Sequence, residues 1–358
     1  MKKKVLIGLS GGVDSSVATH ILIEQGYEVS AVTMKVYDAK KYPNLTSSVR
    51  SSCFGGDEEK DLEDAEKVAK HFKIPFHIID LSDKYEELIL NYFKDEYRSG
   101  RTPNPCIKCN QQIKFGLLLD ESVKAGIQFD YFATGHYAKI EYNSEKKRFL
   151  LKKANFLEKD QSYFLSLLSQ EQFSKIILPL GEYTKSKVRS IAKNIGLFTS
   201  DKTESQDFYS GDYTELLDEK GKTGNIVDIN GRCLGQHSGI ENYTIGQRKG
   251  LGISSKEPLY VVQLNKEKNE VIVDVEKGLF SDNLIAFDLN WILFDEIKEP
   301  LKAKVRIRYR HTEGAATIYP IENKKIKVIF DEPQKAITPG QVIVIYDNDI
   351  VVGAGFIE

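Results

Sequence analysis

The chain has 358 residues, of which 41% are hydrophobic, and its formal net charge is −2 at pH 7. This length and composition exclude a small disulfide scaffold and a disordered chain, and they predict a globular protein of two or three domains. The sequence has no run of about 18 apolar residues and no leader-type cleavage pattern, so we expect a cytoplasmic protein with no membrane partner. Because the net charge is nearly neutral, any surface that binds nucleic acid has to be local.

The first predicted element is an apolar strand from Lys4 to Gly8, followed by the turn SGGVDS (10–15) and a helix that ends near Gly26. The two glycines let backbone N–H groups approach a phosphate, the hydroxyls of Ser10, Ser15 and Ser16 add donors, and the positive end of the helix points at the same anion. The patterns G-x-x-x-x-G-K-[ST] and G-x-G-x-x-G are absent. The turn resembles the PP-loop of ATP pyrophosphatases, which cleave ATP between its α and β phosphates and adenylate an acceptor.

Strands and helices then alternate along the chain. We expect strands at 27–34, 76–80 and 131–134, helices at 61–72, 85–97 and 113–125, and a long loop at 38–59. This alternation predicts an α/β fold with a doubly wound parallel sheet, whose ligands bind at the carboxyl ends of the strands. The Gly-rich turn, Met34 and Gly135-His136 are expected to meet there.

From about residue 207, short strands separated by turn residues replace the helices. We expect a PP-loop domain over 1–206, a small β-rich central domain over 207–279 and a C-terminal β-barrel over 280–358. On the predicted strand 303–309 and its flanks, every second residue is basic: Lys302, Lys304, Arg306, Arg308 and Arg310. A strand would place these five cations on one face, which favours a polyanionic partner over an ordinary solvated face.

Six sequence blocks together resemble the tRNA-specific 2-thiouridylase family. The PP-loop is followed by TPNPCIKCN (102–110), ATGHY (133–137), KDQSY (159–163), YTIGQRKGL (243–251) and TPGQ (338–341), so the resemblance covers almost the whole chain. It implies an adenine nucleotide alpha hydrolase-like fold and a tRNA sulfurtransferase. Such an enzyme adenylates the 2-carbonyl oxygen of the wobble uridine with ATP, releases pyrophosphate, and then replaces that oxygen by sulfur as AMP leaves. The alternatives are another PP-loop RNA thiolase, a small-molecule adenylating synthetase and a non-catalytic RNA-binding paralogue.

The resemblance also implies which residues contact each ligand. ATP would contact Gly8, Leu9, Ser10, Gly11, Gly12, Val13, Asp14, Ser15, Met34 and Gly135, with Mg²⁺ screening the phosphate charge. The target base would contact Asn104, Pro105 and Cys106, in a rim stiffened by its prolines. The tRNA would contact His136, Lys159, Asp160, Gln161, Arg308, Tyr309 and Gln341. Asp14 either positions the loop or a metal or caps the helix, and the place of His136 favours phosphate or RNA contact over acid–base work.

The sulfur path centres on Cys109, which we expect to deliver or activate sulfur because a helix beginning just before Ile113 would favour its thiolate. A second C-x-x-C, needed for structural zinc, is absent. Family members often carry a second cysteine later in the chain, but the matching position here is Tyr209, which cannot carry a persulfide.

Two sulfur routes remain open at this point. Cys106, Cys109 and Cys53 are candidate ligands of an iron–sulfur cluster, and a persulfide and disulfide pair at Cys106 and Cys109 is the alternative. Cys233 is the weaker third ligand and is expected to be a buried small hydrophobe. The sulfur would come from a persulfide-carrying donor or relay protein, or from sulfide.

Overall fold

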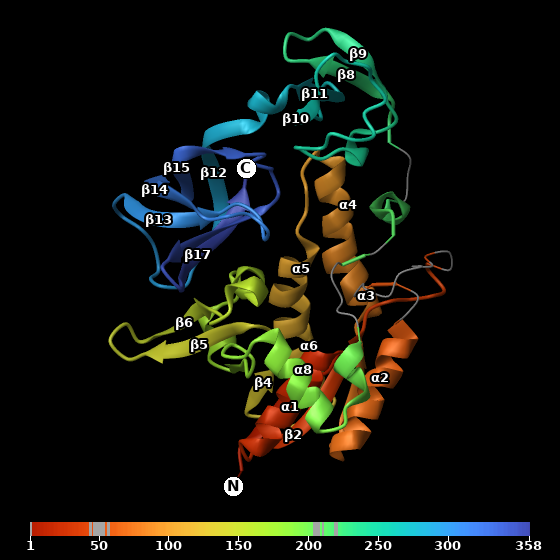
Figure 1. Ribbon diagram of the computed structural model, residues 1–358, viewed down its shortest axis with the longest axis vertical. Coiled ribbons are helices and arrows are strands. Elements are labelled where there is room, and N and C mark those ends of the chain that lie inside the picture. Colours follow the sequence, from red (N-terminus) through yellow and green to blue (C-terminus); the bar gives the residue numbers. More distant parts are fainter. Residues whose placement is uncertain are drawn as a thin grey trace. The chain divides into compact units, whose positions relative to one another are not determined.

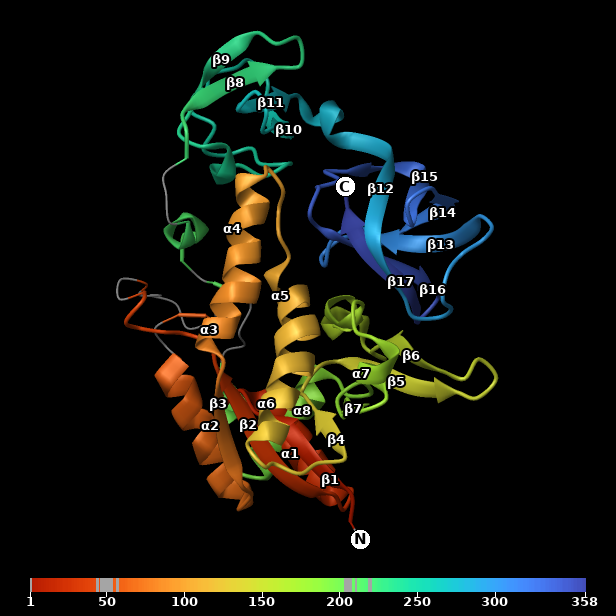
Figure 2. The same cartoon turned by 180° about the vertical axis from the view of Figure 1, so that it is seen from behind.

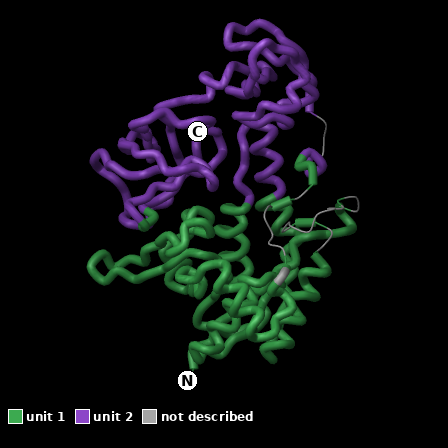
Figure 3. The backbone as a smooth tube through the Cα atoms, viewed as in Figure 1, with its two compact units in different colours: residues 1–89, 106–213, 349–351 green, residues 90–105, 214–348, 352–358 purple. Residues whose placement is uncertain are grey.

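A computed structural model describes residues 2–42, 45, 54–55, 58–202, 208–209, 211–217 and 221–358. The chain divides into two compact units (Figure 3): unit 1 comprises residues 1–89, 106–213 and 349–351, and unit 2 comprises residues 90–105, 214–348 and 352–358. Within the described residues, no helix combines the length and the apolar character needed to span a membrane.

Unit 1 is built around a five-stranded parallel sheet, which confirms the predicted α/β fold. The strand order is β3 (Phe76–Asp80), β2 (Glu28–Lys35), β1 (Lys4–Gly8), β4 (Tyr131–Ala133) and β7 (Ile176–Ile177). β1 pairs in parallel with β2 on one side and with β4 on the other. The strand order therefore changes direction at β1, and open α/β sheets bind their ligands beyond the carboxyl ends of the strands at such a point.

Helices cover both faces of this sheet (Figures 1 and 2). Val5 and Ile7 of β1 are fully buried against α1 (Val13–Glu24), α2 (Glu58–Phe72) and α8 (Lys185–Asn194). On the opposite face, Phe115 packs edge-on against Phe132 of β4, with ring centroids 5.6 Å apart. This division follows the two-residue period of a strand. The other elements of unit 1 are α3 (Ser82–Tyr85), β5 (Ala138–Asn143), β6 (Arg148–Lys153), α7 (Gln170–Phe173) and short helical turns, and η1 (Glu86–Leu90) begins there.

One helical segment, which belongs to unit 1 from Cys106 onward, begins earlier than the predicted helix 113–125. It starts with α5 (Pro105–Lys108), continues through the π-helical η2 (Cys109–Leu117) and ends with α6 (Leu118–Lys124). Proline fits the first turn of a helix, where its missing N–H costs no hydrogen bond. A π-helix leaves backbone carbonyls without their usual α-helical partners. The Gln172 amide donates to two of the carbonyls in η2, at Gln111 (2.9 Å) and Phe115 (2.8 Å).

The first part of unit 2 contains a four-stranded sheet and the helix α4 (Asn91–Arg98). The strand order is β10 (Tyr260–Asn265), β11 (Glu270–Asp274), β8 (Gly224–Asp228) and β9 (Cys233–His237). Ile226, Val261 and Val271 are fully buried in its core. The prediction of a buried Cys233 was wrong: this residue is exposed at the start of the edge strand β9, and its Sγ donates to the Gly235 carbonyl at 3.4 Å.

A closed antiparallel barrel of six strands completes unit 2 and confirms the predicted β-barrel. Its order is β12 (Phe280–Trp291), β15 (Lys325–Lys335), β14 (Gly314–Ile321), β13 (Leu301–Arg306), β16 (Val342–Asp347) and β17 (Ile350–Ile357), and β17 pairs with β12 to close it. Val305, Ile318, Val328 and Ile345 are fully buried inside the barrel. The expected strand 303–309 ends at Arg306, because the chain turns there and the His311 N–H donates to the Arg308 carbonyl at 3.0 Å.

Candidate active site

A cavity of about 290 Å³ lies beyond the carboxyl ends of β1, β2 and β4 in unit 1. It brings together three features expected to meet: the Gly-rich loop, Met34 and Gly135-His136. The residues predicted to bind ATP that line it are Gly8, Leu9, Ser10, Gly12, Val13, Asp14, Ser15, Met34 and Gly135. The other lining residues are Val32, Thr33, Asp61, Lys114, Leu118, Thr134, His136, Gln161 and Lys202. The cavity has the position and the polar lining of a nucleotide site.

Two glycines set the shape of the loop after β1. Gly11, which does not line the cavity, has φ +68° and packs so closely that a Cβ there would lie 2.9 Å from the Asp61 carbonyl oxygen. A Cβ at Gly135 would lie 2.7 Å from the Ser15 nitrogen. Any side chain at either position would therefore displace the loop.

The serines hold the loop from within. The Ser15 hydroxyl accepts from the Ser10 N–H at 3.2 Å, and it lies at the cavity wall. Ser16, expected to offer a hydroxyl to a phosphate, is fully buried, and its hydroxyl donates to the Gly12 carbonyl at 2.7 Å. That expectation was wrong, because Ser16 lies on the core side of α1 rather than at its open end.

Asp14 ties the loop to a helix much later in the chain. Its carboxylate accepts from the Lys185 ammonium at 2.7 and 2.8 Å and from the Tyr137 hydroxyl at 2.7 Å. The residue at the N-cap of α1 is Gly12, which makes no side-chain capping bond. The interpretation of Asp14 as a plain helix cap was therefore wrong, and its contacts are those of a residue that positions the loop.

Lys202 joins the loop to α2. Its ammonium donates to the Gly11 carbonyl at 3.2 Å and to the carboxylates of Asp61 and Asp64, both at 2.9 Å. Burial alone would raise the pKa of Asp64, but the Lys202 hydrogen bond and charge hold it below the ordinary value. This lysine is a cation at the cavity wall whose charge is already shared with two carboxylates.

Lys114 of η2 is the second lysine at the cavity wall, and the described part of the chain offers it no ion pair. Burial and the Lys114 charge hold the pKa of His136 well below its ordinary value, and His136 Nδ1 lies 2.8 Å from the Thr134 hydroxyl. A neutral imidazole attracts phosphate less than a cation does. Lys114 is thus the better candidate for phosphate contact than His136, which sequence reasoning had favoured.

The two cysteines of the C-x-x-C pair begin the helical segment that carries Lys114. Cys106 is its second residue and is partly exposed, whereas Cys109 is the first residue of η2 and only 8% exposed. Cys109 therefore does not precede a helix, as expected, but lies inside one, and Cys106 takes the place in the first turn. The peptide dipoles of a first turn favour an anionic sulfur.

The predicted base rim, residues 102–105, belongs to unit 2 and is held by the loop 338–341. The Gln341 side-chain amide donates to the carbonyls of Thr102 (3.1 Å) and Pro103 (3.0 Å). The Thr102 N–H donates to the Pro339 carbonyl at 2.9 Å, and the Asn104 N–H donates to the Tyr92 hydroxyl at 3.2 Å. Gln341, expected to contact tRNA, thus binds the backbone of the segment expected to contact the base. Pro105 starts α5 and is partly exposed.

The expected tRNA contacts at 159–161 divide into different environments. Asp160 is 2% exposed, and its carboxylate accepts from the N–H groups of Ala154 (3.0 Å) and Ser162 (3.2 Å), so its side chain is not available to RNA as predicted. Gln161 lines the cavity, and its side-chain oxygen accepts from the Tyr137 N–H at 2.9 Å. Lys159 is partly exposed.

The basic segment 302–310 is not one continuous stripe. Lys302 and Lys304 are exposed on β13, but Arg306 is mostly buried, with an ion pair to Glu313 at 2.9 Å and the Tyr346 ring 5.3 Å from its guanidinium carbon. Beyond the strand, Arg308 donates to the Ala336 carbonyl at 3.2 Å. In the same turn, Tyr309 is partly exposed and Arg310 is exposed.

Among the described residues, no group of three His, Cys, Asp or Glu side chains is arranged to hold a metal ion. At the cavity, Asp14 and Asp61 each bind a lysine, so these carboxylates do not fit a protein-held Mg²⁺. Of the candidate cluster ligands, Cys53 lies outside the described residues. Tyr209, at the position of the missing cysteine, is buried.

Sequence reasoning missed the three lysines that surround the phosphate loop: Lys114, Lys185 and Lys202. Each stands outside any recognisable motif, and Lys185 follows Asp14 by 171 residues. Only the fold brings these cations to the loop. The one signal in the sequence was indirect, since a loop for a polyanion without a lysine of its own requires cations from elsewhere.

Three family models match consecutive parts of the chain: a tRNA methyl transferase HUP domain at 3–209, a tRNA methyl transferase PRC-barrel domain at 215–274 and an aminomethyltransferase beta-barrel domain at 281–357. The tRNA-specific 2-thiouridylase MnmA of Acetivibrio thermocellus is 46% identical, over 100% of this chain and 99% of its own length. The protein of that name from Endomicrobium trichonymphae is 47% identical, over 99% of this chain and 98% of its own length. The chain therefore belongs to the tRNA-specific 2-thiouridylase family.

Proposed function

We propose that this protein is an ATP-dependent tRNA 2-thiouridylase that replaces the 2-carbonyl oxygen of the wobble uridine by sulfur. The relatives that it matches along their whole length carry the name of that activity. In unit 1, the observation that carries the proposal is a single helical segment: it presents Cys106 and Cys109 at its start and Lys114 at the wall of the cavity formed by the PP-loop.

The nucleotide half of the reaction follows from the cavity. The uridine O2 attacks the α-phosphorus of ATP, the bond to the β-phosphate oxygen breaks, and pyrophosphate leaves. Oxide is a poor leaving group, whereas AMP, now attached to O2, is a good one. The loop N–H groups and the ammonium of Lys114 stabilise the charge that develops on the phosphates. Lys185 and Lys202 hold the loop through Asp14 and the Gly11 carbonyl.

The sulfur half uses the two cysteines of the same helical segment. With a persulfide on one cysteine, the terminal sulfur attacks C2 of the uridine and AMP leaves. The thiolate of the other cysteine then attacks the cysteine sulfur, which releases the thiocarbonyl and leaves a Cys106–Cys109 disulfide for an external thiol to reduce. The persulfide sulfur comes from a persulfide-carrying donor protein, or from sulfide that attacks the Cys106–Cys109 disulfide, which breaks as the two-electron oxidant and releases the second cysteine as its thiolate. An iron–sulfur cluster would need a third ligand, and we assign it no step.

RNA recognition is shared by several segments in this proposal. The rim 102–105, fixed by Gln341, contacts the target base, and Lys302, Lys304 and Arg310 contribute exposed cations for phosphates. Phosphate contacts supply most of the affinity of a protein for a nucleic acid, whereas contacts to the base select the target.

The test measures pyrophosphate release and sulfur incorporation with and without tRNA. We expect both to require tRNA and ATP. Cys106→Ser and Cys109→Ser should release pyrophosphate in the first turnover but incorporate no sulfur, while Cys233→Ser, an exposed cysteine in unit 2, behaves as wild type. Turnover on a small acceptor without tRNA would instead identify a small-molecule synthetase. Binding of tRNA with no pyrophosphate release would identify a non-catalytic paralogue.

A further inference from the structure

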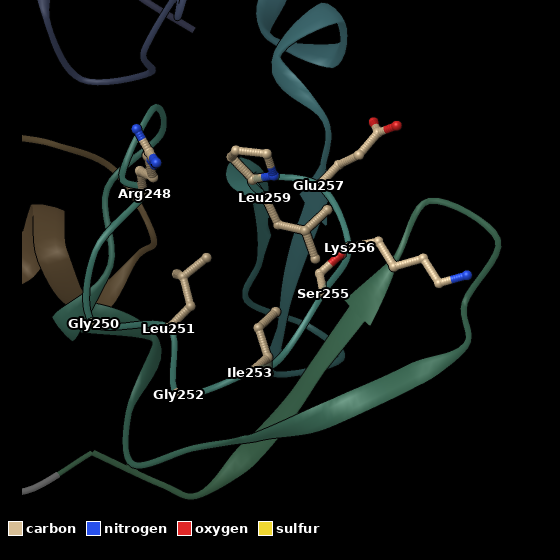
Figure 4. Close-up of a pocket in the computed structure, with 10 residues that line it drawn as sticks. Arg248, Gly250, Leu251, Gly252, Ile253, Ser255, Lys256, Glu257 and Leu259 are labelled. Atoms are coloured by element: carbon tan, nitrogen blue, oxygen red, sulfur yellow. The ribbon is translucent and has the colours of Figure 1, made fainter.

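A second groove lies in unit 2 and is lined by none of the residues assigned above. It has a volume of about 390 Å³ and is lined by residues between Arg248 and Leu259. Figure 4 shows Leu251, Ile253 and Leu259 in its middle, with the side chains of Arg248 and Lys256 at opposite ends. Arg248, Gly250 and Leu251 of its lining belong to the sequence block 243–251 that resembled the family and that the proposed reaction does not use.

The loop beside this groove is fixed by its own hydrogen bonds. The Gln247 side chain accepts from the Thr244 N–H at 3.1 Å and donates to the Lys249 carbonyl at 3.0 Å. The backbone of Gln247 pairs with Val261 of β10, whose N–H donates to it at 2.9 Å. Gly250 (φ +78°) and Gly252 (φ +66°) adopt the left-handed conformation that other residues avoid. The loop therefore presents its tip in one defined shape.

The loop and the opposite end of the groove carry three cations. Arg248, Lys249 and Lys256 are exposed and have no ion pair within the described ranges of the chain. Glu257 is the only acid between residues 243 and 259, so the segment has a net charge of 3 − 1 = +2. In Figure 4 the Glu257 carboxylate extends away from the middle of the groove. Adjacent cations held in a fixed loop repel each other, and an anionic ligand removes that repulsion.

We propose that the loop 243–252, with its groove, binds phosphate groups of the tRNA backbone. This inference rests on the proposed function, since it assigns a second contact surface to the same substrate. A guanidinium forms two parallel hydrogen bonds to a phosphate, the neighbouring ammonium adds a charge, and the hydroxyls of the exposed Ser254 and Ser255 offer further donors. The surface therefore contributes affinity and register, while the rim 102–105 selects the base.

The first experiment measures tRNA affinity of the full chain against salt concentration for the double variant Arg248→Ala/Lys249→Ala. Each lost phosphate contact lowers the slope of log K against log salt by roughly 0.7 to 0.9. Two lost contacts correspond to a Kd about 10 to 30 times weaker near physiological salt. The charge-matched control is Lys266→Ala/Lys268→Ala, two exposed lysines in the turn between β10 and β11, which should change neither quantity.

A second variant separates loop geometry from charge. Gln247→Ala keeps every cation but removes both hydrogen bonds that shape the tip, and it should weaken tRNA binding and reduce the salt slope, with thermal unfolding as the check on folding. An unchanged affinity and slope in the double variant overturns the inference. The inference also fails if the double variant binds tRNA normally and turns over normally with sulfide but no longer turns over with a protein persulfide donor. That result would assign the loop to a protein partner. Failure of the wild type to bind tRNA would instead contradict the proposed function.

Discussion

The phosphate loop 10–15 and the base rim 102–105 are both short segments held by residues far along the chain, but they are held by different forces. Ammonium groups hold the phosphate loop, Lys185 on Asp14 and Lys202 on the Gly11 carbonyl. Hydrogen bonds between neutral groups hold the rim: the Gln341 amide donates to its carbonyls, and the Thr102 N–H donates to the Pro339 carbonyl. An anionic ligand competes for ammonium groups but not for backbone carbonyls. The loop can therefore change its contacts when ATP binds, whereas the rim is set in advance.

The largest effect should come from Lys185→Met, which removes the ionic contact of the loop. It leaves the Asp14 carboxylate with the Tyr137 hydroxyl but without its cation. Hydrogen bonds to a charged group contribute roughly 1.5 to 3 kcal/mol each, and Lys185 makes two of them. We expect lower stability in urea unfolding and a large loss of ATP-dependent pyrophosphate release. Lys187→Met, an exposed change on the same helix α8, is the control. Wild-type behaviour of Lys185→Met would mean that the loop does not depend on this contact.

Gln341→Ala tests the hydrogen bonds between neutral groups that hold the rim. It leaves two carbonyls of the rim without their donor, and such a loss costs about 1 to 3 kcal/mol. We expect the rate of tRNA thiolation to fall roughly ten-fold while the KM for ATP stays unchanged. Gln341→Glu, which places an acceptor against the same carbonyls, should be worse than alanine. An altered KM for ATP with normal thiolation would contradict the assignment of Gln341 to the rim.

Lys202→Met should raise the KM for ATP about ten-fold, equivalent to about 1.4 kcal/mol, without changing tRNA affinity. The change leaves Asp61 and Asp64 beside the loop with one cation fewer, and their charges repel the phosphates of ATP. Adding Asp61→Asn to Lys202→Met removes one of these charges and should restore part of the affinity. If the second change gave no recovery, Lys202 would act by shape rather than by charge.

The smallest effect concerns Glu58, which accepts from neutral N–H groups, as the rim carbonyls do, yet can ionise. Burial raises its pKa to about 7, against the N–H donors of Val36 and Tyr37. Its folded pKa lies above the unfolded value of 4.5, so stability falls as pH rises from about 4.5 through 7. Glu58→Gln keeps the accepting oxygen and removes the charge, and it should flatten this dependence in urea unfolding between pH 5 and pH 8. An equally steep curve would assign the dependence to other groups.

The sequence predicted what depends on local pattern and missed what depends on the fold. The strand, turn and helix of residues 4–24 and the strand at 76–80 follow from neighbouring residues alone, and the structure has them there. The helix expected at 113–125 begins at Pro105. The prolines at 103 and 105 suggested a loop, but proline also fits the first turn of a helix. Arg306 fits the alternating basic pattern of a strand, but its partners Glu313 and Tyr346 come from elsewhere in the barrel. Lys185 and Lys202 carry no local signal at all.

The attachment of the rim to residues 338–341 also bears on the order in which the two sites can form during synthesis of the chain. The Gln341 carbonyl accepts from the Ile357 N–H at 2.8 Å, so the loop that fixes residues 102–105 depends on β17 in turn. A ribosome adding roughly 5 to 20 residues per second needs about 10 to 50 s to travel from the rim to that strand. By then every residue that holds the phosphate loop has been made. During synthesis, all residues that line the nucleotide cavity are made first, and the surface proposed to recognise the base can be completed only with the barrel.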